Sequence, residues 1–319
     1  DQASYDIFTY EMKMNLEGLS YPAAWQIPFQ QFWGMPLNMG QYGSGDNVQP
    51  FKTVKDYDDW QKRVHGFTIW ADTAIANFKQ GMKSGIVLPE KLVKKMIPQM
   101  KDLATADPTK SVFYGPILKM PATFSAADKA RLTASYAQMI STEPTPAYTK
   151  LADFLEKEYL PKARKTSGIN AIPQGDAYYN YLIRYWTTSQ QTPEQIYETG
   201  KQEVTRIRHI MDSIQQSVAY KGSLQDFFKF MQTDKQFFPF ATEQAVLDSF
   251  RNIQKVIDPN LKKMFGRVPK TAFEIRQTEK FREASASAEY VQGTADGTRP
   301  GIFYTPIPDP KKFNSTSGM

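Results

Sequence analysis

From Thr53 onward, apolar residues recur at the alternating spacings of three and four that an amphipathic helix requires. Trp60, Val64 and Phe67 begin this pattern, and Thr53-Val-Lys-Asp56 before them resembles a capping box. Similar signals predict helices over 53–81 or 53–85, from Pro89 through Met100, from Ser125, over 151–159, over 175–188, from Thr192 to Gly222, from Ser223 and from Thr242. The chain is therefore expected to fold as a mainly α protein.

The helix after Thr192 has the clearest start. The Thr192 side chain can accept a hydrogen bond from a backbone N–H, Pro193 lacks an N–H at a position that does not need one, and the Gln195 side chain can bond back to the cap residue. Its apolar residues are expected to form a buried stripe: Val204, Ile207, Met211, Ile214 and Val218.

Two regions depart from the helical pattern. Residues 1–52 are rich in Pro, Gly and aromatic residues, which predicts an irregular segment packed on a helical body formed by residues 53–319. Near the end of the chain, residues 273–276 alternate like a strand, and residues 301–306 form a short β-prone run after an Asp-Gly turn. A small β element is expected there.

Composition excludes several kinds of protein. The 319 residues are 41% hydrophobic, which suffices for a substantial core, yet no apolar run approaches the roughly 18 residues that cross a bilayer. There is no cysteine, so disulfides and thiolate chemistry are excluded. The net charge of +6 comes from scattered pairs such as Lys94-Lys95, so a nucleic-acid partner is not expected.

Residues able to carry hydrolytic chemistry are few. A cysteine-free zinc site needs histidines and carboxylates one helical turn apart, but His65 and His209 each lack a second histidine at that spacing. No Gly-x-Ser-x-Gly sequence occurs, which leaves no nucleophile elbow. We therefore expect no catalytic residue and no metal ligand within this chain.

Two segments could still contribute to a ligand cleft. The aromatic helix that includes Tyr178, Tyr181 and Tyr185 could line a cleft or pack in the core. In the segment from Asp296 to Tyr304, Arg299 could pair with a ligand carboxylate, or it could simply hold Asp296 in a tight turn. Asp296, Arg299 and Tyr304 are the candidate substrate-binding residues.

Several motifs together resemble the bacterial domain-of-unknown-function family 885. They are Tyr178-Tyr-Asn-Tyr-Leu-Ile-Arg-Tyr-Trp, Thr192-Pro-Glu-Gln-Ile-Tyr-Glu-Thr-Gly200, Gly222-Ser-Leu, Phe237-Phe-Pro and Asp296-Gly-Thr-Arg-Pro-Gly-Ile-Phe-Tyr304. The resemblance covers at least residues 53–310, and the last motif is its most specific part.

The resemblance implies a zincin-like metallopeptidase with long helices and a deep cleft, often secreted or lipid-anchored. It also implies a zinc cofactor held by a His-Glu-x-x-His-type motif after the segment that ends at Tyr304, with the motif's Glu as general base. In such enzymes an edge strand commonly holds the extended substrate, and residues 302–305 are the candidate here. Arg299 would position a substrate carboxylate or hold Asp296, and Tyr304 would lie near the cleft.

This chain contains no such motif before Met319. We therefore expect the natural protein to continue or to have lost a C-terminal part, and the 319 residues alone to be inactive and to bind no zinc. The first residues, from Asp1, suggest a processed N-terminus. The family resemblance implies a periplasmic or cell-envelope location, with a lipid anchor upstream of residue 1.

Two hypotheses remain open at this point. The chain is either the helical lobe of a zinc-dependent peptidase acting on peptides, or an extracytoplasmic helical binding or scaffold protein without catalysis. If polypeptide is missing, the remaining helices should expose an apolar surface that drives association.

Overall fold

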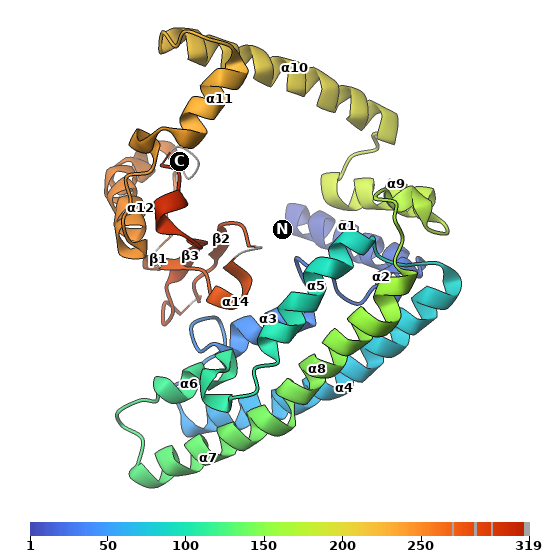
Figure 1. Cartoon of the computed structure of the whole chain (residues 1–319), viewed down its shortest axis with the longest axis vertical. Coiled ribbons are helices and arrows are strands. Elements are labelled where there is room, and N and C mark those ends of the chain that lie inside the picture. Colours follow the sequence, from blue (N-terminus) through green and yellow to red (C-terminus); the bar gives the residue numbers. More distant parts are fainter. Residues whose placement is uncertain (270, 284–285, 295, 316–319) are drawn as a thin grey trace. The chain divides into compact units, whose positions relative to one another are not determined.

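A computed structural model describes residues 1–269, 271–283, 286–294 and 296–315. The chain is mainly helical with a small sheet near its C-terminal end, which confirms the expected mainly α class and the small β element (Figure 1). It divides into two compact units, Asp1–Gln195 (unit 1) and Ile196–Met319 (unit 2). This division differs from the boundary at residue 52 that the sequence suggested.

Unit 1 consists of helices joined by turns and irregular segments. Their bounds are α1 Gln2–Gly18, α2 Ala23–Gln26, α3 Met35–Gly43, α4 Val54–Ser84, α5 Glu90–Leu103, α6 Gly115–Leu118, α7 Ala126–Thr142, α8 Pro144–Phe154 and α9 Gly175–Thr187. A π-helical segment, Leu155–Tyr159, continues α8. The helix expected over 151–159 is thus the second half of a longer helical element that begins at Pro144.

The longest helix of unit 1, α4, forms as the sequence predicts. The Thr53 side chain accepts from the backbone of Asp56, whose carboxylate in turn accepts from the Thr53 backbone. The helix ends at Gly85, whose φ of 78° suits glycine. Its apolar stripe is buried, and α8 lies beside it (Figure 1).

The N-terminal segment is more helical than its Pro and Gly content suggested. Helix α3 spans Met35–Gly43 even though it contains Pro36, because a proline in the first helical turn removes an N–H that has no helical partner. The segment is bonded to the helices of unit 1, since Tyr148 donates to the Pro36 carbonyl oxygen at 2.7 Å and Gln99 to that of Gln31 at 2.9 Å. The segment predicted to be irregular is therefore partly helical.

The aromatic helix α9 is divided between interior and surface. Tyr181 is buried, and its ring stacks on that of Tyr178 with 5.9 Å between the ring centroids. The Tyr181 hydroxyl donates a hydrogen bond to the Met14 carbonyl oxygen at 2.9 Å. Tyr179 and Trp186 are exposed. Core packing therefore accounts for one side of α9 only.

Buried tyrosines make unit 1 sensitive to alkaline pH. Burial raises the pKa of Tyr57 to about 12 and that of Tyr159 to about 12. Their pKa in the unfolded chain is near 10, so their contribution to stability is complete below about pH 10 and is lost as the pH rises toward 12. We expect the urea midpoint of unit 1 to fall over that range, and less steeply in Tyr57→Phe. A midpoint that stays constant up to about pH 11 would contradict this expectation.

Unit 2 contains most of α10 together with the sheet. Its elements are α10 Pro193–Ser217, α11 Leu224–Thr233, α12 Glu243–Ile257, α13 Leu261–Met264, β1 Phe273–Gln277, α14 Lys280–Glu283, β2 Glu289–Val291 and β3 Gly301–Thr305. The cap at Thr192 is confirmed, because the Thr192 hydroxyl accepts from the Gln195 backbone at 3.3 Å and the Gln195 side chain accepts from the Thr192 N–H at 2.9 Å.

The sheet of unit 2 has the strand order β1-β3-β2. Strand β3 pairs in parallel with β1 and antiparallel with β2, so both of its edges are occupied. Residues 302–305 therefore cannot act as the edge strand that the resemblance implied, and the outer edges of this sheet belong to β1 and β2.

The apolar stripe of α10 is exposed, although the sequence pattern predicted burial. Val204 is 67% exposed, Ile214 is 51% exposed, and Gln215 is the buried residue of the helix. Helical periodicity shows which side chains share a face, but it does not show whether another element covers that face. None of the helices, within the described ranges, is long and apolar enough to span a membrane.

Candidate functional site

The three candidate substrate-binding residues have different environments. Asp296 is exposed in a turn, where its carboxylate accepts from the backbone N–H and the hydroxyl of Thr298 at 3.0 and 2.8 Å. The Arg299 guanidinium donates to the backbone carbonyl oxygens of Gln292 and Pro300. Both residues thus hold the turn that leads into β3.

Tyr304 belongs to the interior of unit 2, where it is 1% exposed. The Arg282 guanidinium lies 5.7 Å from the centroid of its ring. Because successive side chains of a strand point to opposite faces, Phe303 lies on the other face of the sheet.

The face of the sheet that carries Phe303 borders a cavity. In the strand register, Phe303 is opposite Ile275 of β1 and Tyr290 of β2, so these three side chains form one row across the sheet. Helix α12 packs against β1, and the cavity has a volume of about 850 Å³. Its lining comprises Phe250, Ile253, Gln254, Ile257, Asp258, Leu261, Lys262, Val268, Pro269, Thr271, Ala272, Phe273, Ile275, Tyr290 and Phe303.

The lining of this cavity suits an apolar group with a polar neighbour. Most of it is aliphatic or aromatic, and the charged side chains are those of Asp258 and Lys262. Pockets that bind small ligands or side chains typically have volumes of about 300–1,000 Å³ with this kind of lining. The cavity is the candidate functional site of unit 2.

Gly301 leaves room for the Tyr290 side chain at the start of β3. A Cβ atom at this position would lie 2.3 Å from the Tyr290 hydroxyl oxygen, so a side chain there would displace the tyrosine. The motif from Asp296 to Tyr304 marks this segment in the sequence but does not mark Phe303. The alternation within residues 301–305 could have shown that Phe303 and Tyr304 lie on opposite faces. It could not have shown the strand pairing that places Tyr290 and Ile275 beside Phe303.

A network of charged groups lies at the opposite face of the sheet. Arg282 is 7% exposed, donates to Glu279 at 2.6 Å and also pairs with Glu289 of β2. The second carboxylate oxygen of Glu279 is buried without a hydrogen-bond partner. Glu283 accepts from the backbone N–H of Ile307 at 2.7 Å. These contacts link α14 to β2 and to the chain after β3.

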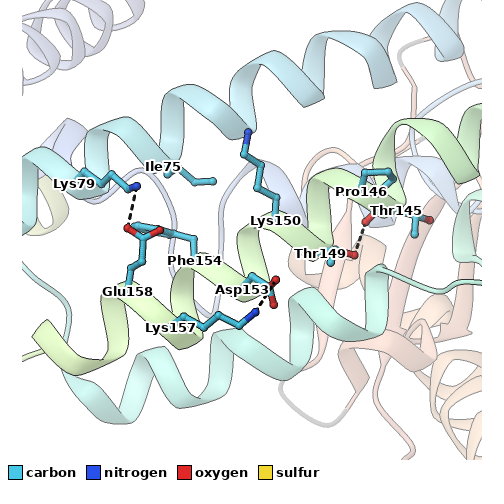
Figure 2. Close-up of a pocket in the computed structure, with 10 residues that line it drawn as sticks. All are labelled: Ile75, Lys79, Thr145, Pro146, Thr149, Lys150, Asp153, Phe154, Lys157 and Glu158. Carbon is cyan, nitrogen blue, oxygen red and sulfur yellow. Dashed lines mark hydrogen bonds and ion pairs between the residues drawn. The ribbon is translucent and has the colours of Figure 1, made fainter.

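A groove on unit 1 is the other concave feature of note, with a volume of about 590 Å³ between α4 and α8 (Figure 2). Its charged side chains pair with one another: Lys79 with Glu158 at 2.9 Å and Lys157 with Asp153 at 3.0 Å. Lys150 pairs with Asp72. Because these cations are neutralised and half-exposed, the groove offers less for ligand recognition than the cavity of unit 2 does.

The residues present do not fit the zinc that the resemblance implies. Nδ1 of His65, on α4, lies 3.4 Å from a carboxylate oxygen of Glu143, and the His65 side chain is 69% exposed. His209 is exposed on α10. Across the described part of the chain, no three residues among His, Cys, Asp and Glu are grouped so as to hold a metal ion.

The arrangement defines a mainly helical protein whose C-terminal unit holds an apolar cavity against a three-stranded sheet. The sequence belongs to the family described as "Bacterial protein of unknown function (DUF885)", whose model matches residues 1–319. The expected family is thereby confirmed, whereas its relation to zincins stays a proposal.

A solved structure shares this fold. It is described as "the putative lipoprotein from Colwellia psychrerythraea", with a TM-score of 0.79 and 22% sequence identity. The match covers 90% of this chain and 50% of the other, so this chain spans about half the length of that relative. No curated protein matches the sequence significantly.

Proposed function

We propose that this chain forms the helical portion of a zincin-like, zinc-dependent peptidase whose metal ligands lie on polypeptide outside these 319 residues. The observation that carries the proposal is the apolar cavity beside β3, because β3 belongs to the motif with the most specific family resemblance. The length of the Colwellia relative supports it, since a protein of that size has room for a second half.

In this proposal the cavity receives an apolar side chain of a peptide substrate. Phe303, Ile275 and Tyr290 provide its floor on the sheet. Asp296 and Arg299 act as positioning residues, because the turn that they hold sets where β3 begins. An extended substrate backbone would pair with an outer edge of the sheet, on β1 or β2.

The relative described as a lipoprotein supports a location in the bacterial cell envelope. We propose that the complete protein acts there on peptides. A lipid anchor upstream of residue 1 is part of the same proposal.

The proposal is tested by peptide hydrolysis with the complete gene product. We expect cleavage that a chelator abolishes, and in Phe303→Ala an increase of about tenfold in KM for peptides with a large apolar side chain, equivalent to about 1.4 kcal/mol. Met264→Ala is the control, because Met264 is 78% exposed and lies outside the cavity lining. A complete product that cleaves no peptide, or that keeps its activity with the chelator, would refute the proposal.

The second candidate function is a binding protein without catalysis. It is favoured by the cavity, because the lining comes entirely from unit 2 and so needs no further polypeptide to form. It predicts that the 319-residue chain binds apolar peptides equally well with and without a chelator in calorimetry. Loss of that binding on chelation would argue against it.

A further inference from the structure

The exposed apolar residues of α10 form a regular seam rather than scattered contacts with solvent. We define the α10 seam as Tyr197, Gly200, Val204, Ile207, Met211, Ile214 and Val218. The spacings after Gly200 are four, three, four, three and four, which is the heptad pattern of a coiled-coil contact. All seven positions belong to unit 2, and Val218 lies one residue beyond the end of α10.

Within unit 2, the seam is exposed along its whole length. Tyr197 and Val204 are each 67% exposed, and Met211, the least exposed of its large apolar side chains, is 38% exposed. A Cβ atom added at Gly200 would meet nothing within 4 Å, so the backbone is open to close approach there. A continuous apolar stripe of this length is typical of an interaction surface.

Interactions within α10 are too weak to stabilise it as an isolated helix. Its other side chains form local ion pairs, such as Arg206 with Glu203 at 2.7 Å and Lys201 with Glu198 at 3.1 Å. Such exposed pairs contribute at most about 0.5 kcal/mol each. Most helices in proteins depend on packing of an apolar face, and α10 buries only Gln215, whose side chain donates to the Gly222 carbonyl oxygen.

We propose that the α10 seam is the docking surface for an amphipathic helix from polypeptide of the same protein outside these 319 residues. The heptad spacing calls for a helix, and the stretch from Tyr197 to Val218 accommodates a partner of about three heptads, roughly 32 Å long. Gly200 permits its close approach at one end of the seam. The bound helix carries its own apolar a and d residues against this stripe.

The Colwellia relative indicates where the occupant comes from. That protein matches the fold of this chain with only half of its own length, which leaves as much polypeptide again to cover faces such as this one. A second copy of this chain would also bury the seam, and the test below separates the two occupants.

The inference shares with the proposed function the requirement for further polypeptide, but it needs neither a metal nor catalysis. Protection of the seam in a complete product that holds no zinc would reject the proposed function alone. Zinc-dependent hydrolysis by a product whose seam stays open would reject this inference alone.

Thiol labelling tests the inference directly, because these 319 residues contain no cysteine. Ile207→Cys puts a thiol on the seam, and Gln202→Cys puts the matched control on the opposite side of the same helix, where the native residue is also exposed. Each is treated with a maleimide in the 319-residue chain and in the complete gene product, and the rate is compared with that of the parent protein.

We expect both thiols to react at similar rates in the dilute 319-residue chain. In the complete product, Ile207→Cys should react at least about tenfold more slowly, whereas Gln202→Cys should be unaffected. Equal rates in the two proteins would overturn the inference. Protection of Ile207→Cys in the 319-residue chain that disappears on dilution would also overturn the inference, because it would assign the seam to a second copy of the chain. A gene whose product ends at Met319 would overturn it as well.

Discussion

Replacing Trp60 by alanine is expected to lower the free energy of unfolding of unit 1 by about 3–5 kcal/mol. Trp60 is 0% exposed in the middle of the α4 stripe, and its ring packs edge-on against Phe51 at 5.9 Å between centroids. The variant leaves a cavity that surrounding rings cannot fill without moving. Urea denaturation followed by circular dichroism measures the effect.

Trp60→Phe is the matched control for this prediction. The indole N–H of Trp60 is buried without a hydrogen-bond partner, so phenylalanine removes an unsatisfied donor while it keeps an aromatic ring in the site. We expect less than half of the alanine effect. Equal losses in the two variants would show that packing around Trp60 is not what stabilises unit 1.

Replacing Arg282 by methionine is expected to destabilise unit 2 by about 3–5 kcal/mol. Arg282 is 7% exposed, and its guanidinium donates to Glu279 at 2.6 Å and pairs with Glu289. Its loss leaves the Glu279 carboxylate buried without its cation, and that carboxylate already has one oxygen without a partner. The urea transition of unit 2 reports the loss.

Two further variants separate charge from packing at this site. Lys280→Met removes a neighbouring cation that is 67% exposed and pairs with Glu243 and with the buried Glu283, so the loss of stability should be smaller than in Arg282→Met. Adding Glu279→Gln to Arg282→Met should recover part of the loss, because the unpaired charge is gone. No recovery in the double variant would contradict the electrostatic explanation.

Helix starts could be predicted from the sequence because their signals are local. Thr53, Ser125, Ser223 and Thr242 each accept from a backbone N–H three residues ahead, as expected for N-caps. The stop at Gly85 is equally local, since it depends on the left-handed conformation of one residue.

Features that depend on contacts distant in sequence could not be predicted. The strand-like runs 273–276 and 301–306 were recognised, but the position of β3 between β1 and β2 depends on pairing that the runs do not encode. The periodicity of α10 was recognised as well, but not the exposure of its apolar face.

The candidate site was only partly predictable for the same reason. The segment from Asp296 to Tyr304 does border the cavity, through Phe303. Alternation along a strand turns Tyr304 to the other face, toward Arg282. Residues such as Phe250 and Ile253 reach the cavity from α12, and nothing in their local sequence marks them as neighbours of β3.

The zinc content of the purified proteins shows whether the metal ligands lie outside these 319 residues. Elemental mass spectrometry of the complete gene product and of the 319-residue chain, prepared in parallel without chelators, gives the ratio of metal to protein. We expect a stoichiometric zinc ion in the complete product and none in the 319 residues alone, because His65 and His209 lie on separate helices without further ligands grouped around them in the described part of the chain. Tightly bound, stoichiometric zinc in the 319-residue chain, or a complete product that binds none, would contradict it.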